Sequence, residues 1–228
     1  YNYIFFVAST KNLSYNKIYR YDIETKKNKI IYSNNDPYFF INIFCLKNEL
    51  FMNISRYDGN SLHIYNLNNN KFNTILPFKS DFTYEIDIFN NNYYILERFK
   101  SSNKIYKTND FKNKELIHKS SNKEDIYSNL SVLNDKYLIA TCKNYENVFI
   151  ICSNLCNKNT QKIHIIDTFI HNNTDVKLYD IKYIFTQNTQ YSNDFYVKIK
   201  SFLFPSKTLY VNLDKKLMHV LEDSPKNS

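Results

Sequence analysis

The stretch YEIDIFNNNYYILERFKSSNKIYKTND, residues 84–110, contains three apolar runs whose side chains alternate with polar ones, separated by turns rich in Asn and Ser. Alternation with a period of two is the pattern of a half-buried β-strand. A fourth run, ELIHKS (115–120), follows after another polar turn. The stretch therefore predicts four consecutive strands joined by short connections.

The same order of strands recurs along the chain. Five strand-turn-strand pairs each precede a further apolar run, and four of the five units also have a leading strand: FFINIFCL, YEIDIF, SNLSVL and LYDIKYIF. The first unit starts at IFFV, so we expect its leading strand to lie outside this chain. If Ile18, Ile64, Ile105, Phe149 and Leu209 are equivalent, the spacings between them are 46, 41, 44 and 60 residues.

A period of about 40–50 residues with four strands per unit is typical of a β-propeller. We therefore predict an all-β fold, a β-propeller with about five four-stranded blades, in one domain at residues 1–224. A β-sandwich is the main alternative because it also uses short alternating strands, but regular four-strand units favour the propeller. Asp58-Gly59 predicts a tight hairpin turn. Pro205 predicts a connection between two strands, since proline cannot donate to a sheet ladder.

The chain has one glycine, Gly59, and this composition excludes several kinds of site. A Gly-x-Ser-x-Gly nucleophile elbow, a P-loop and a dinucleotide fingerprint each require more than one glycine. The five histidines lack an evident nucleophile partner. Cys152, Cys156 and His164 lack the spacing of a zinc site. We therefore predict no catalytic residue, no cofactor and no metal in this chain.

Charge and cysteine usage limit the partners and the compartment. The net charge is +8, but the lysines are scattered singly or in pairs and form no dense basic block. This distribution makes a nucleic-acid partner the less favoured interpretation. The four cysteines lack the spacing of a disulfide framework, which predicts free thiols in a reducing compartment, the cytoplasm. No apolar run reaches the roughly 18 residues that span a bilayer, so no membrane partner is expected.

One stretch carries a family resemblance. SFLFPSKTLYVNLDKKLMHVLEDSP, residues 201–225, resembles the last propeller blade of the prolyl oligopeptidase family of serine peptidases. The units YEIDIFNNNYYILERFKSSNKIYKTND and SVLNDKYLIATCKNYENVFIIC resemble the two preceding blades, in the oligopeptidase B (protease II) branch. Asn212 departs from the Asp that is more frequent in the family, and Lys215-Lys216 replaces the usual glycine.

The resemblance implies a two-domain enzyme. A seven-bladed propeller would cover an α/β-hydrolase domain that carries Ser, Asp and His, and would admit only short peptides. Residues 1–228 would contain about five of the seven blades and none of the hydrolase domain. The partner would therefore be the hydrolase domain of the same polypeptide.

Four charged residues lie on predicted leading strands, which line the central channel of a propeller. Glu85 and Asp87 share one face of YEIDIF, and Asp180 and Lys182 share one face of LYDIKYIF. We expect these side chains to line the channel and to bias which peptides pass. The alternative is a solvated strand face without selectivity.

Three functions are compatible with the sequence. The first is a non-catalytic lid and size filter of an oligopeptidase B-like serine endopeptidase that hydrolyses short peptides. The second is a stand-alone propeller that serves as a protein-interaction scaffold. The third is a basic, aromatic-rich β domain that binds nucleic acid through stacking and phosphate contacts.

Overall fold

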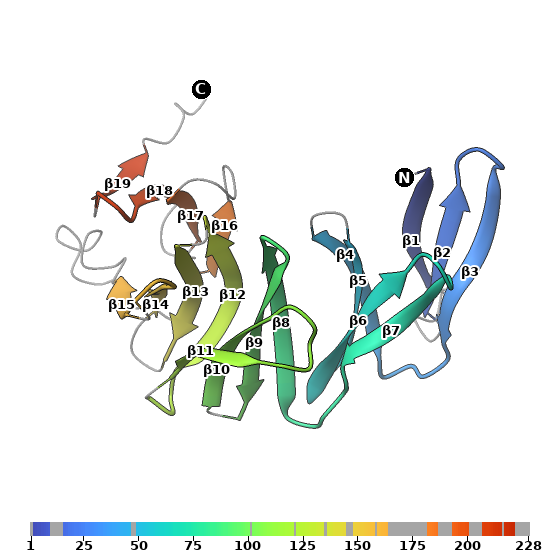
Figure 1. Ribbon diagram of the computed structural model, residues 1–228, viewed down its shortest axis with the longest axis horizontal. Helices are drawn as coiled ribbons and strands as arrows, with labels where there is room; N and C mark the ends of the chain where they lie inside the picture. The colour runs from blue at the N-terminus through green and yellow to red at the C-terminus, as the bar shows by residue number, and fades with distance from the viewer. Residues whose placement is uncertain are drawn as a thin grey trace. The chain divides into compact units, whose positions relative to one another are not determined.

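All of the regular secondary structure described in the computed structural model is β-strand (Figure 1). The described residues are 2–9, 16–46, 49–100, 102–120, 122–134, 136–144, 148–157, 159–163, 182–186, 193–200, 207–215 and 217–221. Two compact units are present, Tyr1–Tyr84 and Glu85–Ser228. The boundary between them falls inside a strand, β8, and the single domain at residues 1–224 remains a prediction.

Five antiparallel sheets, called blades 1 to 5 here, follow one another in sequence. Blade 1 contains β1 (Tyr3–Ser9), β2 (Asn16–Asp22) and β3 (Lys27–Asn34). Blade 2 contains β4 (Phe40–Leu46), β5 (Glu49–Arg56), β6 (Gly59–Asn66) and β7 (Lys71–Leu76). Blade 3 contains β8 (Phe82–Phe89), β9 (Asn92–Phe99), β10 (Ser102–Thr108) and β11 (Glu115–Lys119). Blade 4 contains β12 (Ile126–Leu133), β13 (Tyr137–Lys143), β14 (Val148–Asn154) and β15 (Thr160–Ile163). Blade 5 contains β16 (Lys182–Thr186), β17 (Asp194–Lys200), β18 (Lys207–Asn212) and β19 (Leu217–Leu221).

Within each blade the strands pair only with their neighbours in sequence. This order is the meander of a propeller blade, and it confirms the predicted units, including a first unit with three strands. Short hairpins make the order possible. Asn90 and Asn91, for example, both adopt the left-handed conformation in the turn between β8 and β9, which is the geometry of a type I′ hairpin.

The core lies between successive sheets of the same unit. In the first unit, Ile18 of blade 1 packs in one cluster with Met52 and Ile54 of blade 2. In the second unit, one buried cluster joins blades 3 and 4, and another joins blades 4 and 5. Each sheet therefore needs apolar side chains on two faces, which explains the large number of apolar strand residues in the sequence.

A recurring β-bulge identifies equivalent positions in blades 1 to 3. The register with the outermost strand shifts directly after Ile18 and again directly after Ile105. In blade 2 the same shift follows Leu62, which is 1% exposed. Leu62 is therefore the equivalent residue, and not Ile64. The corrected spacings are 44 and 43 residues.

Phe149 and Leu209 belong to the opposite face from Ile105. Ile105 lies in a cluster with the following blade, whereas Phe149 and Leu209 lie in clusters with the preceding blade. Because side chains alternate along a strand, a shift of one residue moves a side chain to the other face. The predicted equivalence of these residues was therefore wrong.

Gly59 is required for a different reason than the one predicted. The hairpin turn lies at Tyr57-Asp58, and Gly59 pairs with Arg56 as the first residue of β6. Its backbone is not in the left-handed region. A Cβ atom at Gly59 would lie 2.7 Å from the carbonyl oxygens of Lys79 and Phe82, so close backbone approach demands the glycine. Pro205 lies outside the described residues, between β17 and β18.

Candidate functional site

Two of the predicted charged residues lie on the innermost strand of blade 3. Asp87 is 8% exposed, and its Oδ2 accepts hydrogen bonds from the Val132 N–H at 2.8 Å and the Ser131 hydroxyl at 3.5 Å. Both donors belong to β12, the innermost strand of blade 4. The Asp87 carboxylate therefore connects the innermost strands of two neighbouring blades.

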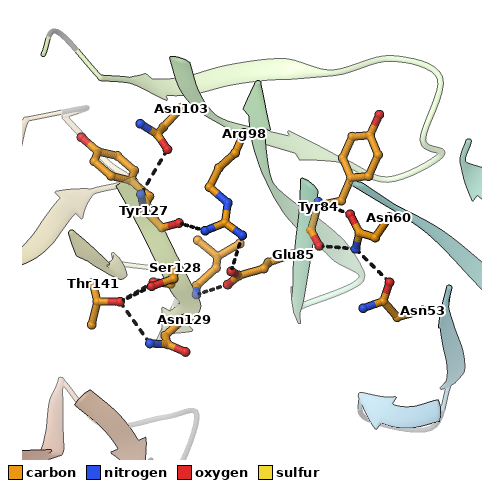
Figure 2. A network of polar contacts seen from close by, with 11 residues as sticks. Asn53, Asn60, Tyr84, Glu85, Arg98, Asn103, Tyr127, Ser128, Asn129 and Thr141 are labelled. Atoms are coloured by element: carbon orange, nitrogen blue, oxygen red, sulfur yellow. Dashed lines mark hydrogen bonds and ion pairs between the residues drawn. The ribbon is translucent and has the colours of Figure 1, made fainter. Parts of the chain in front are cut away.

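Glu85 makes the same kind of contact one step along β8. Its Oε2 accepts a hydrogen bond from the Leu130 N–H at 3.1 Å, and its Oε1 lies 3.7 Å from Nη2 of Arg98 (Figure 2). Nη1 of Arg98 donates to the carbonyl of Tyr127 at 2.7 Å. The side chains of Arg98 and Glu85 are 25% and 30% exposed, so this ion pair borders solvent.

These contacts satisfy the edge of a sheet. β12 is the first strand of its sheet, and among the described strands it pairs only with β13, so no described strand covers the N–H groups on its other edge. The register of β12 shifts between Ser128 and Ser131, where Asn129 is in the left-handed conformation. The Leu130 N–H lies inside this bulge, and the Val132 N–H follows it. Asn129 itself donates to the Thr141 hydroxyl at 3.1 Å. The acidic residues therefore act as acceptors for an edge that lacks a ladder.

The other two predicted residues lie on the innermost strand of blade 5 or before it. Lys182 is the first residue of β16, but its side chain lies outside the described part of the chain. Asp180 also lies outside the described residues. A lining role for these four residues in a central channel remains a prediction.

An asparagine at the start of the third strand forms a second link between blades. In the second unit, Asn103 donates to the Asp125 carbonyl at 2.6 Å and accepts from the Tyr127 N–H at 3.1 Å. In the first unit, Asn60 donates to the carbonyl of Tyr84 at 3.0 Å and accepts from the N–H of the same residue at 2.6 Å (Figure 2). Asn16 donates to the carbonyl of Phe39 at 3.0 Å. These asparagines were not predicted from the sequence, although NKIY occurs identically at 16–19 and 103–106.

A serine–histidine pair lies in blade 2 but does not form a triad. The Ser61 hydroxyl is 2.9 Å from Nε2 of His63, and the Thr74 hydroxyl is 3.0 Å from Nδ1. The third member is therefore a hydroxyl instead of a carboxylate, and Ser61 is only 6% exposed. Burial lowers the pKa of His63. The pair lies within the sheet of blade 2, with Ser61 buried and His63 half-buried between β6 and β7.

The cysteines and the possible metal ligands are the remaining groups with chemistry of their own. Among the described residues, no group of three or more His, Cys, Asp or Glu side chains could bind a metal ion. All four cysteines are free, and burial raises the pKa of Cys152 to about 12. In the described ranges, no helix is long and apolar enough to cross a membrane.

The fold is similar to that of part of several known peptidases. A structure from a study of two prolyl endopeptidases matches 99% of this chain with a TM-score of 0.72 at 13% identity. Oligopeptidase B from Trypanosoma brucei matches 97% with a TM-score of 0.74 at 11% identity, and oligopeptidase B from Leishmania major matches 97% with 0.71 at 12%.

These matches cover 34%, 32% and 32% of the known structures, so the chain spans about a third of their length. The matching part is their β-propeller, which confirms the predicted fold class. No protein-family model and no curated protein matches the sequence.

Proposed function

We propose that this chain is the non-catalytic propeller of an oligopeptidase B-like serine endopeptidase, and that it restricts access of peptides to a catalytic domain. One observation carries the proposal. The structural match covers 97–99% of this chain but only 32–34% of each peptidase chain. The rest of such a polypeptide would contain the α/β-hydrolase domain as the partner. Short peptides would be the substrates.

The local chemistry supports a non-catalytic role. In the Ser61–His63 pair the serine is buried, and the third partner is the Thr74 hydroxyl instead of a carboxylate. The polar groups on the innermost strands of blades 3 and 4 are engaged in holding those strands together. A domain that encloses substrates while another domain catalyses the reaction requires rigid contacts between its blades and does not require reactive groups of its own.

The Glu85–Arg98 ion pair is the proposed selectivity element. It borders solvent at the innermost strand, where a peptide passing along the blades would meet it. Neutralising Arg98 would leave a net negative group, and neutralising Glu85 would leave a net positive one. We expect the two variants to shift the preference for charged peptides in opposite directions. We place the protein in the cytoplasm, in line with its four free thiols.

Serine labelling tests the proposal. We expect a fluorophosphonate probe to label one serine in the full polypeptide that contains residues 1–228, and none in the 228-residue chain alone. The full polypeptide should cleave a short peptide. It should not cleave the same sequence when that sequence is part of a folded protein. A labelled serine in the isolated chain, or a full polypeptide without a reactive serine, would overturn the proposal.

A further inference from the structure

The hairpin between β5 and β6 contains Asp58-Gly59, the one Asp-Gly pair of the chain. In such a pair the glycine nitrogen can attack the aspartyl Cγ, because the glycine has no side chain to shield it. A C–N bond forms, the nitrogen loses its proton, and the carboxyl hydroxyl leaves as water. Hydrolysis of the resulting succinimide ring takes up one water. It returns aspartate or gives isoaspartate, in which the main chain runs through the side-chain carboxyl group.

The fold requires both members of this pair. A Cβ atom at Gly59 would lie 2.7 Å from two carbonyl oxygens of the segment between β7 and β8, so a larger residue does not fit. Oδ2 of Asp58 accepts a hydrogen bond from the Ser80 hydroxyl at 2.9 Å, and the Asp58 carbonyl accepts one from the Asp81 N–H at 2.5 Å. The chain therefore retains a reactive pair at a point that joins the hairpin to the next connection.

Arg56 keeps the Asp58 carboxyl group in an unreactive form. Nε and Nη2 of Arg56 donate to Oδ1 and Oδ2 of Asp58 at 2.6 and 2.8 Å. The Asp58 side chain is 10% exposed, and the hydrogen bonds from Arg56 lower its pKa to about 2. Ring closure expels the hydroxyl of a neutral carboxyl group. An ionised carboxylate with both oxygens hydrogen-bonded is therefore a poor target for the glycine nitrogen.

The guanidinium group of Arg56 is itself held by aromatic rings. Its Cζ lies 4.9 Å from the ring centre of Phe78, 5.5 Å from that of Phe39 and 5.6 Å from that of Tyr57. The rings of Phe39 and Phe78 meet edge to face, with their centres 5.8 Å apart. Cation–π contacts favour this position of the guanidinium group. They therefore support the pair with Asp58, although the Arg56 side chain is 31% exposed.

Isomerisation would disturb the contacts that follow the turn. An isoaspartyl linkage adds one atom to the main chain directly before Gly59. Asn60, the next residue, donates to the Tyr84 carbonyl at 3.0 Å and to Oδ1 of Asn53 at 2.8 Å (Figure 2). A longer main chain would displace Asn60 from these partners and weaken the link between the hairpin and β8.

We propose that Asp58 is a site of aspartate isomerisation in this chain, and that Arg56 controls its rate by holding the carboxylate ionised and hydrogen-bonded. Loss of Arg56, or local opening of the turn, starts the reaction. The product carries a free α-carboxylate at residue 58. This group is the substrate of repair methyltransferases, which transfer a methyl group from S-adenosylmethionine to isoaspartyl α-carboxylates. The inference does not depend on the proposed function.

Ageing with site-resolved analysis tests the proposal. The 228-residue chain and a synthetic peptide of residues 54–62, ISRYDGNSL, are incubated at pH 7. Isoaspartate at residue 58 is measured by chromatography and fragmentation mass spectrometry. Isomerisation leaves the mass unchanged, which distinguishes it from deamidation of asparagine. We expect the folded chain to react about tenfold or more slowly than the peptide, because a pKa lowered from 3.8 to about 2 depletes the neutral carboxyl group by at least that factor.

Substitution of Arg56 separates its effect from the general rigidity of a folded chain. Arg56→Ala should isomerise about tenfold faster than the wild type, because the pKa of Asp58 returns towards its ordinary value. Arg56→Lys retains the charge without the two parallel bonds and should show an intermediate rate. Ser80→Ala removes one hydrogen bond to Asp58 and should have the smallest effect. The matched control is Arg20→Lys, since Arg20 of the same unit bonds Tyr65 and Asn70 instead.

Circular dichroism establishes which variants are folded, and the comparison uses those. If Arg56→Ala does not fold, Arg56→Lys decides. A folded Arg56 variant that isomerises no faster than the wild type would overturn the proposal. So would a wild-type chain that reacts as fast as the peptide. Equal acceleration by Arg20→Lys would assign the effect to general loosening of the first unit and would overturn it as well. The expected result is acceleration by the Arg56 variants and none by the control.

Discussion

The contact between blades 1 and 2 and the contact between blades 3 and 4 have the same plan but differ in one strand. In the second unit, Phe89 closes the apolar cluster, and Asp87 binds the edge of β12. In the first unit the corresponding place is a cavity beside a three-stranded sheet. The innermost strand β8 thus joins its blade to the next one through its last apolar residue and its acidic side chains.

The strongest test removes the residue that distinguishes the two contacts. Phe89→Ala should create in the second unit the cavity that the first unit has, and should lower the free energy of unfolding by about 3–5 kcal/mol. Urea denaturation followed by circular dichroism measures this change. Phe99→Ala, at a position that is 39% exposed, is the matched control and should cost less than about 1 kcal/mol. Equal effects of the two substitutions would refute the role given to Phe89.

The acidic link should contribute less. Asp87→Ala leaves the buried N–H of Val132 without its acceptor, so we expect a loss of about 1–3 kcal/mol in unfolding free energy. Glu85→Ala is the control, because the Glu85 side chain is 30% exposed and water can replace it at the Leu130 N–H. If Glu85→Ala lowered the free energy of unfolding as much as Asp87→Ala, burial of the carboxylate would not explain the loss in the Asp87 variant.

The asparagine link comes next in size. Asn103→Ala removes the donor to the Asp125 carbonyl and the acceptor of the Tyr127 N–H. We expect the free energy of unfolding to fall by about 1–2 kcal/mol. Asn103→Asp retains the acceptor alone and should fall between the wild type and the alanine variant. Thermal unfolding of the three proteins, with the exposed Asn109→Ala as a control, measures the order. An aspartate variant as stable as the wild type would show that the donated bond contributes nothing.

The smallest expected effect depends on pH. His118 of β11 contacts the hydroxyl of Tyr127 on β12 and that of Thr160 on β15, both at 3.0 Å. Burial lowers the pKa of His118, while the charge of Asp125 raises it in part. Below about pH 6.5 the unfolded chain therefore binds a proton at His118 more readily than the folded chain does. Because protons then favour the unfolded state, the free energy of unfolding should fall as the pH decreases below about 6.5. His118→Gln should flatten the dependence of melting temperature on pH between 7 and 5, in comparison with the wild type. An unchanged slope would argue against a neutral His118 in the folded state.

Much of the fold could be predicted from alternation alone. Period-two runs and polar turns indicated the units of four strands, and IFFV at the start of the first unit indicated a blade with three. Alternation could not assign faces across units, because the turns between strands differ in length and an offset of one residue exchanges the two faces of a strand. Phe149 and Leu209 were therefore assigned to the wrong face.

The site was less accessible from the sequence. Glu85 and Asp87 could be placed on one face of an innermost strand, but their partners are backbone N–H groups of a strand about 45 residues later. Backbone groups have no sequence signature, and neither does the bulge at Asn129 that precedes them. The asparagine link did have a signature, the repeated NKIY, which a direct comparison of the units would have revealed.

Strict pairing with neighbours in sequence also has a consequence for synthesis on the ribosome. A blade can complete its own ladders as soon as its strands have emerged, but the apolar face at Ile18 or Ile105 is covered only when the following blade arrives. With repeats of 44 and 43 residues and about 5–20 residues added per second, that face stays open for roughly 2–9 s. The repeat length thus sets a recurring period in which each nascent blade presents an uncovered apolar sheet to chaperones or to other chains.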